Sequence, residues 1–146
     1  MPKFEREVEI DAPIEKVWDV LTDPNQWPHW FPGIESVSNV TAISENGKFN
    51  WKDEGKTGQG TILKLDPPKR LEVMTQMGKD KDSHVFVLKA TGGFLGLDKD
   101  ETKIEYTLDT MMGGGIITNF LAGGNPRDAL RVKKAMHAFR RLVENK

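Results

Sequence analysis

The stretch VEIDAPIEKVWDVLTDPNQWPHWFPGI, residues 8–34, decides the fold because its periodicity changes within a few residues. Apolar and charged side chains alternate over residues 3–10, which is typical of a half-buried strand. Over residues 14–21 the apolar side chains recur three and four positions apart, which predicts a short amphipathic helix. Three prolines follow, and they allow only one further helical turn, after Asp23. We therefore expect one strand and then two short helices.

The middle of the chain is expected to form six strands joined by short turns. Turn signals rich in Gly, Asn, Asp and Pro separate the segments, as at 45–47, 54–56 and 66–68. Strands joined by so few residues can only be antiparallel neighbours, because a parallel return needs a crossover of about a dozen residues or more. The predicted strand segments are 34–44, 47–54, 57–66, 70–77, 82–91 and 101–111.

A long amphipathic helix is expected to begin near Pro126. Its apolar stripe runs from Ala129 to Val143, and Lys and Arg cover much of the remaining surface. A sheet with one apolar face must bury that face, and this stripe is the only large partner that the sequence offers. The sequence thus predicts an α+β fold, in which a seven-stranded antiparallel curved sheet wraps around the C-terminal helix. We expect a single domain over residues 1–146.

Composition excludes several classes of function. With 21 basic and 22 acidic residues, the net charge of -1 provides no global field for nucleic acid. The absence of cysteine rules out disulfides, a thiol nucleophile and thiolate metal sites. No apolar run approaches the roughly 20 residues of a membrane helix, and no signal-peptide pattern follows the charged N-terminal residues. We therefore expect a cytoplasmic protein with no transmembrane segment, no nucleic-acid partner, no metal and no cofactor.

The order of these elements resembles the helix-grip fold, and three short motifs strengthen the resemblance. They are Val8–Pro13 (VEIDAP), Val17–Pro24 (VWDVLTDP) and Trp27–Ile34 (WPHWFPGI). They resemble the START-like, birch-pollen-allergen-like superfamily and, within it, the polyketide cyclase/dehydrase and lipid-transport (SRPBCC) family. The resemblance covers the whole chain and implies a cavity between the sheet and the C-terminal helix. The motifs are architectural and do not name a substrate.

The inward face of the predicted sheet indicates the ligand site. Alternation in each strand places large apolar side chains inward with a few polar ones among them, which suits a pocket for a hydrophobic small molecule. A dry packed core is the alternative. Glycine-rich segments at 92–97 and 111–120 carry apolar side chains and are candidates for a gate. The expected ligand-binding residues are Trp51, Thr61, Leu63, Val73, Thr75, His84, Phe86, Tyr106, Leu108, Phe120, Met136 and Phe139.

Two residues are candidates for catalysis. His84 and Tyr106 lie in phase with apolar inward residues of their strands, so they could form the proton-transfer pair of a cyclase or dehydratase. A structural role in the core is the alternative for each. None of the common metal, nucleotide or acyl-transfer motifs is present. Trp27, Trp30 and Phe31 could form an exposed aromatic patch, but we expect them to pack against the sheet.

The sequence leaves three functions open. The first is binding or transport of a hydrophobic small molecule, such as a lipid, polyketide or aromatic metabolite, in the internal cavity. The second is a polyketide cyclase or dehydratase that uses His84 and Tyr106. The third is a protein-interaction module. The basic face of the last helix could touch acidic lipid headgroups at a membrane surface, although a solvated charged face explains it better.

Overall fold

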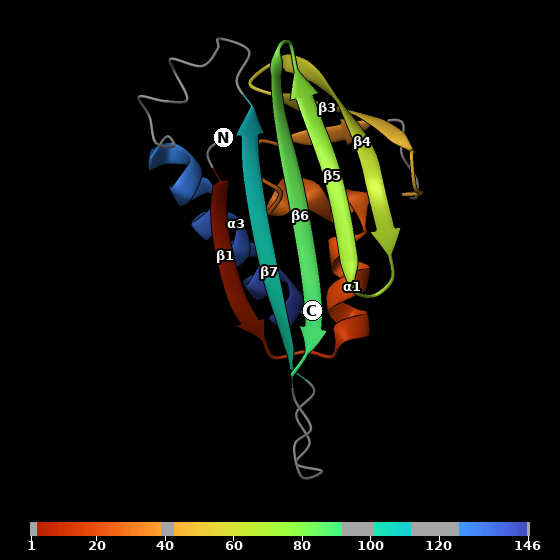
Figure 1. Ribbon diagram of the computed structural model, residues 1–146, viewed down its shortest axis with the longest axis vertical. Coiled ribbons are helices and arrows are strands. Elements are labelled where there is room, and N and C mark those ends of the chain that lie inside the picture. The colour runs from red at the N-terminus through yellow and green to blue at the C-terminus, as the bar shows by residue number, and fades with distance from the viewer. Residues whose placement is uncertain (1–2, 39–42, 92–100, 112–125, 146) are drawn as a thin grey trace.

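In the computed structural model a seven-stranded antiparallel sheet carries the described helices on one of its faces (Figure 1). The structure describes residues 3–38, 43–91, 101–111 and 126–145. None of the helices in these ranges is long and apolar enough to cross a membrane. The elements in chain order are β1 (Lys3–Ile10), α1 (Ile14–Leu21), the 3-10 helix η1 (Pro24–His29), β2 (Ser36–Ser38), β3 (Lys48–Asp53), β4 (Lys56–Asp66), β5 (Arg70–Met77), β6 (Asp80–Ala90), β7 (Thr102–Met111) and α3 (Pro126–Glu144).

The strands are ordered β1-β7-β6-β5-β4-β3-β2, and each pair of neighbours is antiparallel. This order follows from the short connections, because consecutive strands from β2 to β7 can only fold back on one another. The first strand joins the free side of β7, with Lys3 opposite Asp109 and Ile10 opposite Thr102. The predicted meander is confirmed, and its N-terminal strand lies beside its last one.

Most predicted boundaries agree with the structure within two residues, but the segment 34–44 differs. Among its described residues only Ser36–Ser38 are in a strand. Ile34 is instead buried in the turn that follows η1. That turn uses Gly33 at φ 80°, a backbone conformation that glycine adopts at no steric cost. Residues 39–42 lie outside the described ranges.

The inward face of β4 was predicted wrongly at Thr61 and Leu63. A β-bulge between Ile62 and Lys64 shifts the register by one residue, so Leu63 is left 39% exposed. Before the bulge the buried positions are Gly58, Gly60 and Ile62, and Thr61 faces the other way. After the bulge Leu65 lies opposite the buried Leu71 and packs against the core.

Two glycines of β4 are required by the rings opposite them. Gly58 is paired with Trp51, and a Cβ at Gly58 would lie 2.5 Å from Trp51 Cε2. Gly60 is paired with Phe49, whose ring occupies the place of a Cβ at Gly60. The inward row of β4 therefore has two gaps that aromatic side chains of β3 fill.

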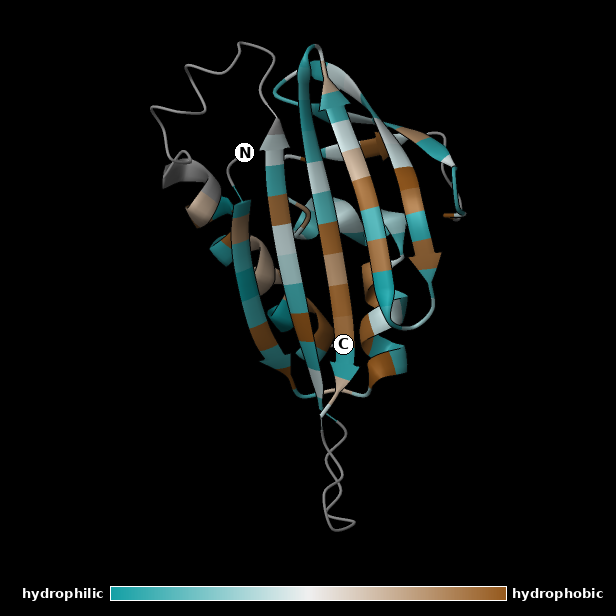
Figure 2. Ribbon diagram, in the orientation of Figure 1, coloured by the Kyte–Doolittle hydropathy of each residue, from teal (hydrophilic) through white to brown (hydrophobic). Residues whose placement is uncertain are grey.

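The core lies between the sheet and α3. Figure 2 shows hydrophobic and hydrophilic residues alternating along the strands, as a one-sided sheet requires. The apolar stripe of α3 begins at Val132 rather than at Ala129, which is exposed. The buried residues of this helix are Val132, Ala135, Met136, Phe139 and Val143.

The N-terminal motifs pack under the sheet, which confirms that prediction. Trp27, Trp30 and Phe31 are all buried. The indole nitrogen of Trp27 donates a hydrogen bond to the carbonyl oxygen of Leu21 at 2.9 Å, which joins η1 to the end of α1. The side chain of Asp23 caps η1 by accepting from the backbone N–H of Asn25 at 3.0 Å.

Candidate functional site

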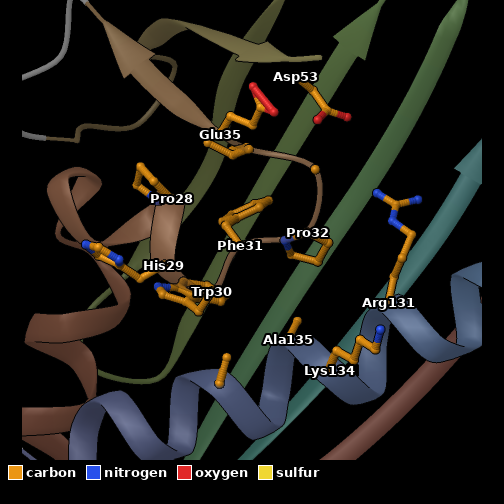
Figure 3. A pocket seen from close by; sticks show the side chains of 13 residues that line it. Pro28, His29, Trp30, Phe31, Pro32, Glu35, Asp53, Arg131, Lys134 and Ala135 are labelled. Atoms are coloured by element: carbon orange, nitrogen blue, oxygen red, sulfur yellow. The ribbon is translucent and has the colours of Figure 1, made fainter.

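A groove lies between α3 and the chain that leaves η1, and we refer to it as the α3 groove (Figure 3). Its volume is about 380 Å³. One wall comes from the segment that leaves η1 and from the end of β3, and the other comes from α3. It is lined by Pro28, His29, Trp30, Phe31, Pro32, Gly33, Ile34, Glu35, Asp53, Arg131, Lys134, Ala135 and Ala138.

The floor of the groove is aromatic. The backbone N–H groups of Trp30 and Phe31 both donate to the carbonyl oxygen of Trp27, at 3.1 and 2.8 Å, so the chain makes a tight turn there. The Trp30 ring lies between the helix and the sheet, with its centroid 4.8 Å from that of Phe139 on α3 and 5.5 Å from that of Phe86 on β6. These rings occupy the space between sheet and helix at this level, where the sequence predicted an internal cavity. The α3 groove lies on the outer side of them.

The two walls carry opposite charges. Arg131 and Lys134 lie on the α3 wall, and Glu35 and Asp53 lie on the opposite wall (Figure 3). The Nη2 atom of Arg131 also forms an ion pair with the Oδ2 atom of Asp82 on β6, at 3.5 Å. Burial raises the pKa of Asp53 above its ordinary value, and the neighbouring acidic residues add to this effect. The groove thus combines an apolar floor with a polarised rim.

One polar atom of the floor has no partner. The indole Nε1 of Trp30 is buried and makes no hydrogen bond within the described part of the chain. Figure 3 shows this nitrogen on the side of the ring that faces His29, another residue of the groove. A buried N–H without an acceptor costs on the order of 1–3 kcal/mol. An acceptor supplied by a ligand would remove that cost.

Beneath the floor, three buried side chains form a hydrogen-bonded chain, which we call the Thr75–His84–Tyr106 chain. Nδ1 of His84 lies 2.6 Å from the hydroxyl oxygen of Tyr106, and Nε2 lies 2.9 Å from the hydroxyl oxygen of Thr75. Adjacent strands bring these residues together, since β5 and β7 flank β6. Burial, and then the charge of Arg131, lowers the pKa of His84 to about 3. The imidazole is therefore neutral at pH 7, with one nitrogen donating and the other accepting.

The groove and the buried chain are neighbours. The ring of Phe31, part of the groove floor, lies 4.7 Å from the ring of His84 between centroids. Arg131 lines the groove and its charge acts on His84. Phe31 therefore separates the groove from a polar group in the core.

The structure brings His84 and Tyr106 together as the sequence predicted, but it does not place the predicted ligand set in the groove. Thr61 and Leu63 are corrected by the bulge in β4, and Phe120 lies outside the described residues, as do the gate segments 92–97 and 112–120. None of the predicted ligand-binding residues lines the α3 groove. The others are buried in the core: Trp51, Val73, Thr75, His84, Phe86, Tyr106, Leu108, Met136 and Phe139.

The groove residues were missed because their sequence signal is the same as that of a packed turn. Trp30 and Phe31 are buried, as predicted, yet they present part of their surface to the groove. The pairing of positive α3 residues with negative residues of the facing wall is not visible in either segment by itself. Within the described ranges, no three His, Asp or Glu side chains come together as a metal site.

The strand order and the long helix α3 that packs against the sheet define the helix-grip class of fold. The family described as polyketide cyclase / dehydrase and lipid transport matches residues 1–144, and the chain belongs to this family. No curated protein matches the chain.

Several solved structures share the fold. The chain is similar to protein BH1534 of Bacillus halodurans, with 16% identity, a TM-score of 0.74, and coverage of 99% of this chain and 98% of that one. It is similar to DynU16, a protein of the dynemicin biosynthetic locus, with 16% identity and a TM-score of 0.68, over 99% of this chain and 48% of that one. It is also similar to Aha1 of Colwellia psychrerythraea, solved as a dimer, with 18% identity and a TM-score of 0.66, over 99% and 97% of the two chains.

Proposed function

We propose that this protein binds a hydrophobic small molecule in the α3 groove. The observation that carries the proposal is the groove itself, which has a volume of about 380 Å³, an aromatic floor and a charged rim. Ligand pockets commonly hold about 300–1,000 Å³ and combine an apolar lining with a few polar groups that orient the ligand. Membership of a family described by polyketide chemistry and lipid transport supports a hydrophobic ligand.

The energetics favour an apolar ligand body. Each methylene group that leaves water for the groove contributes roughly 0.8 kcal/mol. Trp30 and Phe31 form the apolar floor of the groove, although they are only 4% and 3% exposed, and Ala135 and Ala138 are small residues of the α3 wall. Charged groups on the rim remain in contact with water and cost little to bring close to a ligand.

We extend the proposed site inward to the residues that contact the floor. His84 contacts Phe31, and Phe86 and Phe139 contact Trp30. Tyr106 is stacked on Phe86, with centroids 4.5 Å apart, and belongs to the same group. A ligand that displaces the Phe31 ring would meet the imidazole of His84 and, beyond it, the hydroxyl group of Tyr106.

Filling the groove tests the proposal. N-phenyl-1-naphthylamine is neutral and apolar, and its fluorescence increases in an apolar site. The wild-type protein should bind this probe, and Ala138→Trp should weaken binding at least tenfold because the new side chain fills the groove. His137→Trp adds the same ring at the adjacent exposed position, which does not line the groove, and should bind as the wild type does. Equal binding by Ala138→Trp, or no binding by the wild type, would contradict the proposal.

A second candidate function is a cyclase or dehydratase reaction. The contact of 2.6 Å between His84 and Tyr106 favours it, because two groups able to exchange a proton lie together in the core. With a pKa near 3, His84 is a weak base, so its contribution would be to orient the Tyr106 hydroxyl group as a donor to a ligand carbonyl. The test requires a poly-β-keto substrate that the wild type converts. Unchanged turnover in His84→Ala and Tyr106→Phe would exclude this role.

A further inference from the structure

Opposite charges lie close to Gly33 in the α3 groove. A Cβ placed on Gly33 would lie 3.4 Å from Nη2 of Arg131 and 4.0 Å from Oδ2 of Asp53. Gly33 has no side chain there, so a cationic and an anionic group border the same small space. An α-amino acid carries its ammonium and carboxylate groups on one carbon atom. The geometry therefore suits a zwitterionic head group.

Two further residues strengthen this polarity. Lys134 follows Arg131 by one helical turn and lines the same wall, and Glu35 extends the acidic wall beside Asp53. The ion pair between Arg131 and Asp82 orients the guanidinium group, and the carboxylate of Asp82 neutralises part of its charge. Lys134 is exposed, and no described residue forms an ion pair with it. Lys134 therefore supplies the additional positive charge for a carboxylate.

The electrostatic environment of Asp53 on the acidic wall favours a cation beside it. Partial desolvation, and then the carboxylates of Glu54 and Glu35, raise the pKa of Asp53, and the charges of Arg131 and Lys56 offset only part of this rise. An ammonium group beside Asp53 would offset this repulsion and return the pKa toward its ordinary value. A simple carboxylic acid has no ammonium group to place beside this wall.

The aromatic floor of the groove can contact the apolar part of the ligand. The Trp30 ring offers an aromatic surface beside Ala135 and Ala138 on α3. A large apolar side chain on the Trp30 ring would thus place a polar head group within reach of both walls.

We propose that the α3 groove binds an α-amino acid with a large apolar side chain. Its carboxylate lies toward Lys134 and Arg131, its ammonium group lies toward Asp53 and Glu35, and its side chain rests on Trp30. This inference rests on the proposed function, because it names the chemical class of the hydrophobic ligand.

Four probes with the same aromatic side chain and different head-group charges test the inference. Phenylalanine carries both charges, N-acetylphenylalanine only the negative one, phenylalaninamide only the positive one, and N-acetylphenylalaninamide neither. Titration calorimetry, or NMR shifts where binding is weak, gives the four affinities. We expect phenylalanine to bind about tenfold more tightly than either singly charged probe, because each of these probes lacks one of the two charge-assisted contacts. The neutral probe should bind most weakly.

Single substitutions should remove one charge contact at a time. Asp53→Asn should weaken phenylalanine and phenylalaninamide about tenfold and leave N-acetylphenylalanine unchanged. Lys134→Ala should weaken phenylalanine and N-acetylphenylalanine and leave phenylalaninamide unchanged. Lys133→Ala, at an exposed position outside the groove, should change none of the affinities.

The outcomes separate this inference from the proposed function. Equal affinity for all four probes, or no binding of any of them while N-phenyl-1-naphthylamine still binds, would overturn the amino-acid assignment and leave the hydrophobic site standing. Failure of N-phenyl-1-naphthylamine as well would overturn both. Tighter binding of N-acetylphenylalanine than of phenylalanine would replace the zwitterion with a simple acid and would also contradict the inference.

Discussion

His84 is the residue whose chemistry departs most from its ordinary behaviour. Its ring is buried, contacts Phe31, and forms hydrogen bonds with the hydroxyl groups of Thr75 and Tyr106. The alternation of apolar side chains in its strand was enough to predict that it faces inward. Its partners could not be predicted, because they depend on the register between three strands.

The stability of the protein should fall on acidification because of this histidine. The unfolded chain takes up a proton near pH 6.5, whereas the folded state resists protonation until about pH 3. Between these values the unfolded state binds more protons, so the free energy of unfolding decreases as the pH falls through this window. The contribution is on the order of a few kcal/mol. Urea unfolding at pH 7.5, 6.0 and 4.5 measures it.

The variant His84→Gln isolates this contribution, because glutamine can form hydrogen bonds but does not titrate. Its free energy of unfolding should decrease less between pH 6.5 and 4.5 than that of the wild type. His137→Gln, at an exposed position, should follow the wild type. Parallel curves for His84→Gln and the wild type would show that His84 is not the group responsible.

Phe31 should control the access of water to His84. Removing its ring in Phe31→Ala connects the α3 groove to the imidazole, so hydration should raise the pKa of His84 from about 3 toward 6.5. The charge of Arg131 should keep the value below 6.5. Phe31→Leu retains most of the apolar volume and should give a smaller rise. NMR titration of the imidazole protons reports the pKa, and an unchanged value in a folded Phe31→Ala variant would contradict the account.

Among the helices and strands, prediction from the sequence succeeded where an apolar pattern repeats over many residues. It failed where one extra residue reverses the face of a strand. Helix α3 was predicted to begin at Pro126 and does so, because its apolar stripe repeats over several turns. Strand β4 was assigned the wrong face around Thr61 and Leu63, since a bulge adds a single residue without an evident sequence signal. The buried glycines of β4 were the indirect signal, because a missing side chain on a strand often marks a close neighbour.

The glycines of β4 should not tolerate a side chain. In Gly60→Ala the new methyl group would occupy the position of the Phe49 ring, and overpacking of this kind costs about 1–3 kcal/mol. Chemical denaturation measures the loss. The double variant Gly60→Ala/Phe49→Leu should be less destabilised than the sum of its single changes, because the smaller side chain leaves room for the methyl group. Simple additivity would show that the two residues do not compete for space.

At the scale of the whole molecule, the order of the elements was predictable, whereas the groove was not. Short turns force the meander, and the apolar stripe of the last helix must cover the sheet. The α3 groove joins residues 28–35 to residues 131–138, which are far apart in the chain and carry no shared pattern. Its existence depends on how deeply Trp30 and Phe31 pack, and this is a property of the folded structure.

We propose above all that a hydrophobic molecule binds in the α3 groove, which lies between α3 and the turn that follows η1. Intermolecular nuclear Overhauser effects between N-phenyl-1-naphthylamine and the protein test it most directly. We expect contacts from the probe to the methyl groups of Ala135 and Ala138 and to the indole ring of Trp30. Contacts confined to the exposed side chains of Leu63 or Leu130, or the absence of any specific contact, would contradict it.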